Sequence, residues 1–142
     1  MKIGICSGYF QRLHAGHRVY INKAIKTFDV VIIIVNNNVQ QKNKYKDFED
    51  IKPVKEIIKE IKEEFPPVVI RISEDKDDTV NKTLKKIRKQ CPSAKLYFCK
   101  DGDRKRNNIP ESKLLAELKI RYKQFHNPKL TSSSDIMGFE LI

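Results

Sequence analysis

Two of the chain's three histidines, His14 and His17, stand three residues apart in a short polar segment, residues 7–17. The segment follows an apolar run and precedes a stretch with helical periodicity. The first N–H groups of a helix have no intrahelical partner, and they carry the positive end of the helix dipole. Imidazoles add donors that are neutral or charged near pH 7. Together these groups indicate an anion site, and phosphate is a ligand that helix N-termini bind readily.

The same histidine pair permits two other interpretations. Histidines at this spacing can ligate a metal ion, but no third ligand stands nearby in the sequence. Both rings can also serve only as caps of the helix. Gly16, which stands between them, allows a ligand to approach the backbone closely, and this favours the anion site.

The elements that must position this segment alternate in type along the chain. Apolar positions Ile21, Ala24, Ile25 and Phe28 recur at helical spacing, whereas the apolar run Val30–Val35 is typical of a strand buried on both faces. Strands are predicted at 2–6, 30–35, 68–72, 96–99 and 120–125. Helices are predicted at 15–28, 53–65, about 80–91, 110–118 and 131–142.

This alternation predicts an α/β fold with one doubly wound parallel sheet of about five strands and helices on both faces. We expect a single domain over residues 1–142, because the chain has no linker, repeat or low-complexity stretch. Ligands of such sheets bind outside the carboxyl ends of the strands. The loops that follow the five predicted strands are therefore where binding residues are expected.

Residues 36–50 are polar and are predicted to form a surface loop that carries Lys42, Lys44 and Lys46. Asp50 is expected to cap the helix that follows this loop. One residue of the pair at 77–78, both aspartates, is expected to cap the next helix in the same way.

Composition narrows the partners and the compartment. The chain has 29 Lys and Arg against 18 Asp and Glu, a net charge of +11, so an anionic partner is expected. Nucleic acids, phosphorylated metabolites and acidic lipids all satisfy that condition. The longest apolar run is far shorter than the roughly 20 residues of a membrane-spanning helix, and the first residues do not resemble a signal peptide. Three cysteines without metal-type spacing predict reduced, mostly buried thiols in a cytoplasmic protein.

The segment from Gly8 to His17, with Phe10 and His14-Ala15-Gly16-His17, resembles the G-x-F-x(3)-H-x-G-H signature of the cytidylyltransferase-like nucleotidyltransferases. Gln11 stands where that family usually carries an acidic residue. Further blocks resemble the family in the same order along the chain: 30–38, 77–80, 102–104 with 108–111, and 132–136. The family motif that ends in this last block usually begins with Arg; Asn127 stands at that position here, and Lys129 is expected to supply the cation.

The resemblance implies transfer of a nucleotidyl group, with CMP from CTP as the main expectation, onto a small phosphorylated acceptor. A phosphate oxygen of the acceptor would attack the α-phosphorus in line, and pyrophosphate would leave. Because this nucleophile is already anionic, positioning and charge stabilisation would carry catalysis. The alternatives are an adenylyltransferase that uses ATP, a catalytically silent nucleotide-binding relative, and a nucleic-acid-binding module. The last is disfavoured, because the aromatic residues are not interleaved with basic residues on a strand.

The resemblance also implies roles for individual residues. His14, His17 and Lys46 are expected to be catalytic, with Lys44 or Lys42 as substitutes for Lys46. Mg²⁺ is expected to be held mainly by the triphosphate, without protein ligands. Relatives commonly form homodimers, and no membrane partner is expected. The expected nucleotide-binding residues are Gly8, Tyr9, Phe10, Gly16, Gly102, Asp103, Arg104, Asn108, Lys129, Ser132, Ser133 and Ser134.

Overall fold

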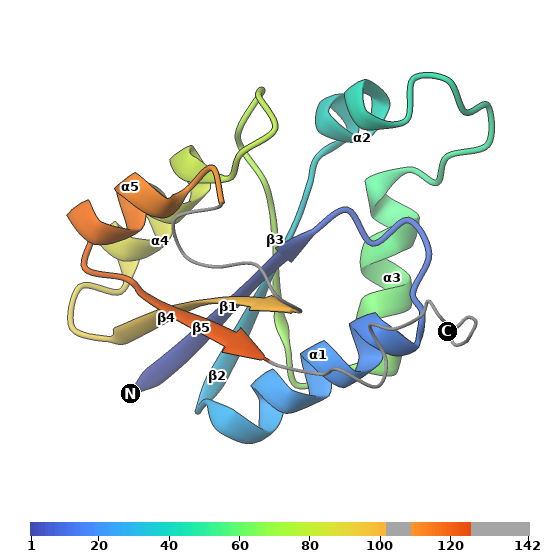
Figure 1. Ribbon diagram of the computed structural model, residues 1–142. Helices are drawn as coiled ribbons and strands as arrows, with labels where there is room; N and C mark the ends of the chain where they lie inside the picture. The colour runs from blue at the N-terminus through green and yellow to red at the C-terminus, as the bar shows by residue number, and fades with distance from the viewer. Residues whose placement is uncertain (102–108, 126–142) are drawn as a thin grey trace.

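The computed structural model describes residues 1–101 and 109–125 and has one parallel sheet covered by helices (Figure 1). The sheet has five strands in the order β3-β2-β1-β4-β5. The strands are β1 (Lys2–Gly8), β2 (Val30–Val35), β3 (Val69–Ile72), β4 (Lys95–Asp101) and β5 (Arg121–Phe125). The helices are α1 (Ala15–Thr27), α2 (Asn38–Lys44), α3 (Val54–Glu64), α4 (Asn81–Gln90) and α5 (Ser112–Glu117). The predicted α/β class and parallel sheet are confirmed.

Two apolar cores lie on opposite faces of the sheet. Successive side chains of a strand point to opposite faces. On β2, Val31 and Ile33 belong to the core that α1 and α3 complete, whereas Ile32 and Ile34 belong to the core beneath α4 and α5. This double coverage explains why β2 is apolar at every position.

The strand order reverses beside β1. From β1 the chain moves outward through β2 to β3, and it then crosses back to β4 on the other side of β1. In the middle of the sheet, Cys6 of β1 pairs in register with Ile33 of β2 and with Cys99 of β4. The carboxyl ends of β1 and β4 therefore form the switch point at which ligands of doubly wound sheets bind.

The segment 36–50 departs from its prediction as a loop, because it contains the helix α2. The Asn37 side chain accepts a hydrogen bond from the Gln40 backbone N–H, and the Gln40 side chain accepts one from the Asn37 N–H. This reciprocal capping box starts the helix. Gln40 and Gln41 are buried, so polar residues that suggested a solvated loop instead form an internal network.

The predicted caps of α3 and α4 are wrong. Asp50 makes no cap to α3, whose first N–H, that of Val54, donates instead to the Asn38 Oδ1 at 3.0 Å. At α4, the capping carboxylate is Asp75, which accepts from the backbone N–H groups of Lys82 and Thr83 at 2.7 and 3.1 Å. Asp77 instead accepts from the Thr79 N–H within its own turn. Asp75 lies in the loop between β3 and α4, and this loop brings its buried carboxylate to the first turn of the helix.

Among the described residues, no helix is long and apolar enough to cross a membrane. The cysteines are all free thiols, with Cys6 and Cys99 buried and Cys91 half-buried, in agreement with the expectation from the sequence. The helix expected at 131–142 lies outside the described residues.

Candidate functional site

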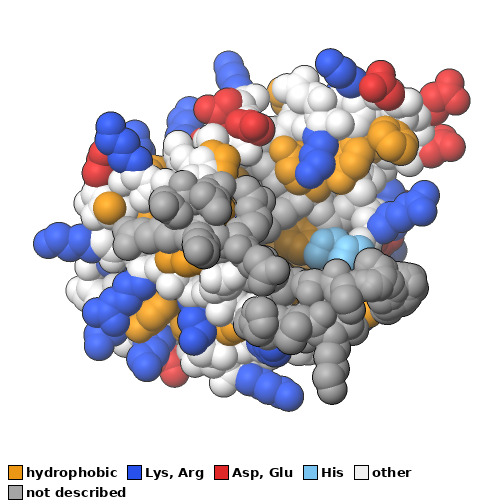
Figure 2. Space-filling view, in the orientation of Figure 1, with side chains coloured by type: hydrophobic (Ala, Val, Ile, Leu, Met, Phe, Trp, Pro, Cys, Tyr) orange, Lys and Arg blue, Asp and Glu red, His pale blue; other side chains and the backbone are white. Residues whose placement is uncertain are grey.

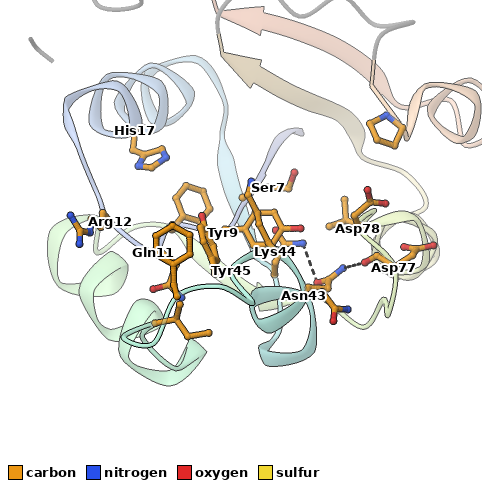
Figure 3. A pocket seen from close by; sticks show the side chains of 18 of the residues that line it. Ser7, Tyr9, Gln11, Arg12, His17, Asn43, Lys44, Tyr45, Asp77 and Asp78 are labelled. Carbon is orange, nitrogen blue, oxygen red and sulfur yellow. Dashed lines mark hydrogen bonds between the residues drawn. The ribbon is translucent and has the colours of Figure 1, made fainter. Parts of the chain in front are cut away.

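A cavity of about 1110 Å³ lies at the carboxyl ends of β1 and β4, at the switch point of the sheet (Figure 3). It is lined by the segment after β1, the start of α1, α2 with the residues that follow it, and the loops before α4 and α5. Four basic side chains (Arg12, Lys44, Lys76, Lys100) and four acidic side chains (Asp50, Asp77, Asp78, Glu111) are among those that line it.

His14 caps the helix α1. Its backbone is extended, and its Nδ1 accepts hydrogen bonds from the N–H groups of Gly16 at 3.1 Å and of His17 at 3.4 Å. An acceptor Nδ1 carries no proton, so in the neutral ring the proton lies on Nε2. The sequence left open whether His14 caps the helix or binds a ligand. Its Nδ1 forms the cap, and its Nε2 carries the N–H of the neutral ring.

His17 stacks against His14 and points into the cavity (Figure 3). The ring centroids are 3.8 Å apart with an interplanar angle of 19°, and the edge of Phe10 closes the other side at 5.2 Å. The buried Nδ1 of His17 has no hydrogen-bond partner within the described ranges. Burial, followed by the neighbouring charge of His14, lowers the pKa of His17 to about 4, so this ring is neutral near pH 7. A buried, unpaired nitrogen is a costly arrangement unless a ligand completes it.

The loop between β1 and α1 depends on Gly8 and Phe10. Phe10 has a positive φ of 53° and is buried at 3% exposure beneath the cavity. A Cβ on Gly8 would lie 2.9 Å from the Phe10 ring, closer than a side chain tolerates. Glycine at this position therefore lets the phenylalanine fold beneath the loop and support the ring of His17.

Of the three lysines in the segment 36–50, Lys44 lines the cavity, whereas Lys42 and Lys46 are exposed and do not. The Lys44 Nζ lies 4.2 Å from the centroid of the Tyr9 ring and 5.8 Å from that of Tyr45, in cation–π contact. Lysines on alternate positions face different directions at a helix end, and sequence spacing alone could not choose among them.

Lys100 lines the cavity and was missed by the sequence interpretation. Its Nζ lies 3.4 Å from the Ser7 Oγ, so the last residues of β4 and β1 meet at the switch point. The available signal was its place directly after the predicted strand 96–99, where the topology puts ligand-binding side chains.

Gln11, which replaces the acidic residue usual in the family, has a structural role. Its Oε1 accepts from the Lys52 N–H at 2.8 Å, and its Nε2 donates to the Lys52 carbonyl at 2.9 Å and to the Gln41 Oε1 at 3.0 Å. A carboxylate could accept the first of these bonds but could not donate the other two. The amide therefore ties the loop after β1 to the segment before α3.

The acidic side of the cavity does not form a metal centre among the described residues. No group of three or more His, Cys, Asp and Glu side chains there could hold an ion. Glu111, 5% exposed, instead accepts a hydrogen bond from the Val80 N–H at 3.1 Å.

The structure brings together part of the predicted constellation. Gly8, Tyr9, Phe10, His14 and His17 line the cavity, and Gly16 lies in the first turn of α1. The remaining predicted nucleotide-binding positions lie outside the described residues: Gly102, Asp103, Arg104, Asn108, Lys129, Ser132, Ser133 and Ser134.

Comparison with known proteins extends over most of the chain. A family model described as cytidylyltransferase-like matches residues 5–138. A phosphopantetheine adenylyltransferase of Kocuria rhizophila is 31% identical over 70 residues, which are 49% of this chain and 42% of that protein. A phosphopantetheine adenylyltransferase of Mycoplasma capricolum subsp. capricolum is 41% identical over 76 residues, which are 54% of this chain and 51% of that protein. The chain thus spans about half the length of the curated relatives it matches.

A solved structure shares the fold. The lipopolysaccharide core biosynthesis protein from Thermoplasma volcanium has a TM-score of 0.60 and 19% identity, over 87% of this chain and 93% of that chain. At this level of identity the likeness concerns the arrangement of strands and helices and not the ligand.

Proposed function

Since the chain belongs to the cytidylyltransferase-like family, we propose that it is a nucleotidyltransferase that moves an adenylyl group from ATP onto a phosphorylated acceptor and releases pyrophosphate. The single observation that carries this proposal is the stacked pair His14 and His17 at the N-terminus of α1, inside a cavity at the switch point. A triphosphate supplies negative charge and acceptor oxygens, which suit imidazole donors at a helix N-terminus.

ATP is proposed in place of CTP, which was the main expectation from the sequence. Both curated relatives described above are named as adenylyltransferases, and both are named for phosphopantetheine. Phosphopantetheine is therefore the first acceptor to test. The histidine pair itself binds phosphate groups and does not distinguish one base from another.

In the proposed reaction, a phosphate oxygen of the acceptor attacks the α-phosphorus of ATP, and the bond to the pyrophosphate oxygen breaks. His14 donates from Nε2, and the His17 ring stacked on it contacts the α- and β-phosphate oxygens in the same corner as charge builds on them. Lys44 and Lys100 carry the positive charge that approaches from two other walls. Mg²⁺ enters on the triphosphate, where it neutralises charge. No general base is needed, because the nucleophile is already ionised.

The proposal is tested by incubating the full chain with Mg²⁺, ATP and 4′-phosphopantetheine, and by following pyrophosphate together with the mass of the adenylylated acceptor. We expect both products in equal amounts, and much slower release when CTP replaces ATP. Lys59→Ala, at an exposed lysine of α3 that does not line the cavity, is the matched control and should turn over normally. Nucleotide binding without product for any phosphorylated acceptor would instead identify a silent relative.

A further inference from the structure

Three aromatic side chains form one wall of the cavity, and the roles proposed above in the transfer of the adenylyl group do not account for them. We call Tyr9, Tyr45 and Phe48 the aromatic rim. Tyr9 and Tyr45 pack edge to face with centroids 6.0 Å apart, and Tyr45 packs on Phe48 in the same way at 5.7 Å. Phe48 is 67% exposed although it lines the cavity. Figure 2 shows hydrophobic side chains exposed along one edge of the hollow, with histidine at the other edge.

The backbone holds the aromatic rim in place. The Phe48 N–H donates to the Tyr45 carbonyl at 2.9 Å in a turn just after α2. The buried Gln41 side chain donates to the Tyr9 carbonyl at 2.8 Å, which joins the loop after β1 to α2. These bonds hold the backbone that carries the three rings, and the rings contact one another edge to face. A surface that is formed before a ligand arrives costs less entropy to use.

Position separates the aromatic rim from the half of the cavity expected to hold the nucleotide. The rim follows β2, and the blocks 102–104 and 108–111 that resemble nucleotide-binding motifs follow β4, on the other side of β1. The cavity volume of about 1110 Å³ exceeds the roughly 300–1,000 Å³ of a pocket for one small ligand, so it has room for a second substrate.

The two ends of the aromatic rim differ in charge. Lys44 lies over the Tyr9 ring, so a cation stands at the inner end of the aromatic rim while the outer end at Phe48 is apolar. A ligand that matches both ends has a phosphate at one end and an extended organic arm with apolar groups at the other.

We infer that the aromatic rim binds the organic arm of the phosphorylated acceptor and selects acceptors with extended arms over short ones such as glycerol 3-phosphate. This inference rests on the proposed function and specifies its substrate class. Lys44 lies near the acceptor phosphate, and Phe48 contacts the far part of the arm.

The test is calorimetric titration of the full chain, in the presence of Mg²⁺ and a non-hydrolysable ATP analogue, with 4′-phosphopantetheine and with glycerol 3-phosphate. Phe48→Ala should weaken phosphopantetheine binding roughly five- to tenfold. It should leave the affinity for the ATP analogue and for glycerol 3-phosphate unchanged. Val39→Ala is the matched control, because Val39 is also exposed on α2 (54%) but does not line the cavity.

Each other outcome overturns the inference. Wild-type protein that does not bind phosphopantetheine, or binds it no better than glycerol 3-phosphate, has no selective arm site. Phe48→Ala that weakens only the ATP analogue would place the nucleobase on the rim. The inference and the proposed function can fail separately. If phosphopantetheine binds through Phe48 but no adenylylated product forms, the aromatic rim is supported as the arm site and the proposed reaction is rejected.

Discussion

At the scale of single residues, the two histidines are chemically different although the sequence presents them as a pair. His14 is the cap of α1 and uses its Nδ1 for that purpose, whereas the His17 ring is largely buried and its Nδ1 lacks a partner in the described part of the chain. Replacing each ring therefore separates the role in stability from the proposed role in phosphate binding.

We expect His14→Ala to lower both stability and turnover. The lost cap costs about 1 kcal/mol, and the lost donor costs about 10²–10³-fold in rate. His14→Asn restores a capping side chain without the imidazole, so it should recover the stability and leave turnover low. His17→Ala should lose the same factor in rate with little loss of stability. Urea unfolding and pyrophosphate release measure the two effects, and full turnover by His14→Asn would mean that His14 is only a cap.

The low pKa of His17 predicts a dependence of stability on pH. The unfolded ring takes up a proton near its usual pKa, whereas the folded ring does so only near pH 4. Between these values the unfolded chain binds more protons, so the free energy of unfolding falls as the pH drops from about 6.5 towards 4. The contribution of His17 lost by pH 5 is about 2 kcal/mol.

The measurement is urea unfolding of wild type and His17→Leu at pH 7.5 and pH 5. Leucine does not titrate, so the variant should lose about 2 kcal/mol less than wild type over this range. Equal losses in the two proteins would contradict the burial of a neutral His17.

The sequence identified the histidine segment but not the neighbours that decide its chemistry. Spacing and the family resemblance were sufficient for His14 and His17. They could not choose Lys44 over Lys46, since that depends on which way the end of α2 faces. They also could not show that Gln11 holds the Lys52 backbone, because its partners come from 30 and 41 residues along the chain.

At the scale of elements, the predicted strands and the helices α1, α3, α4 and α5 were confirmed to within two residues, whereas the predicted caps of α3 and α4 were wrong and α2 was missed. Apolar periodicity marks an element that packs on a core, and this is why β2 and α3 were recognisable. The helix α2 is held by buried amides, Gln40 and Gln41, whose polarity argues for a loop when the partners are unknown. Caps are set by loops that fold back, so the nearest aspartate in sequence was a poor guide.

The cap of α4 gives a prediction at this scale. Asp75 is 6% exposed and accepts from two backbone N–H groups and from the Thr83 hydroxyl, the last at 2.7 Å. Asp75→Ala leaves these donors unpaired, and we expect a loss of about 2–3 kcal/mol in the free energy of unfolding. Asp77→Ala, at an exposed residue that the sequence also suggested as a cap, should cost less than about 1 kcal/mol. Urea unfolding compares them, and equal costs would contradict the assignment of the cap.

At the scale of the whole molecule, the excess of positive charge is not concentrated in the cavity. The chain carries a net charge of +11, whereas the charged side chains that line the cavity in the described residues are balanced, four against four. Long-range attraction of a triphosphate must therefore come from the molecule as a whole, and the histidine corner acts only at contact.

This division predicts how salt affects nucleotide binding. The association rate of Mg²⁺-ATP should fall several-fold when ionic strength rises from about 0.05 M to about 0.5 M, because the Debye length shrinks below the size of the protein. The dissociation rate should change little. Stopped-flow measurement with a fluorescent ATP analogue separates the two rates, and a change confined to dissociation would contradict steering by net charge.

The alternation of elements predicts a doubly wound parallel sheet but not the order of its strands. The observed order β3-β2-β1-β4-β5 places the histidine segment at the switch point, where ligands were expected. The base and the acceptor could not be read from that topology, since many nucleotides fit the same phosphate corner. Their proposed identities rest on the named relatives and on the aromatic rim.

The central claim is that the corner formed by the N-terminus of α1 and its stacked imidazoles binds a triphosphate. The most direct measurement is a crystal structure of the protein with Mg²⁺ and α,β-methylene-ATP. We expect α- and β-phosphate oxygens within hydrogen-bond distance of the rings of both His14 and His17. Phosphates bound elsewhere, with those two rings still stacked and untouched, would contradict it.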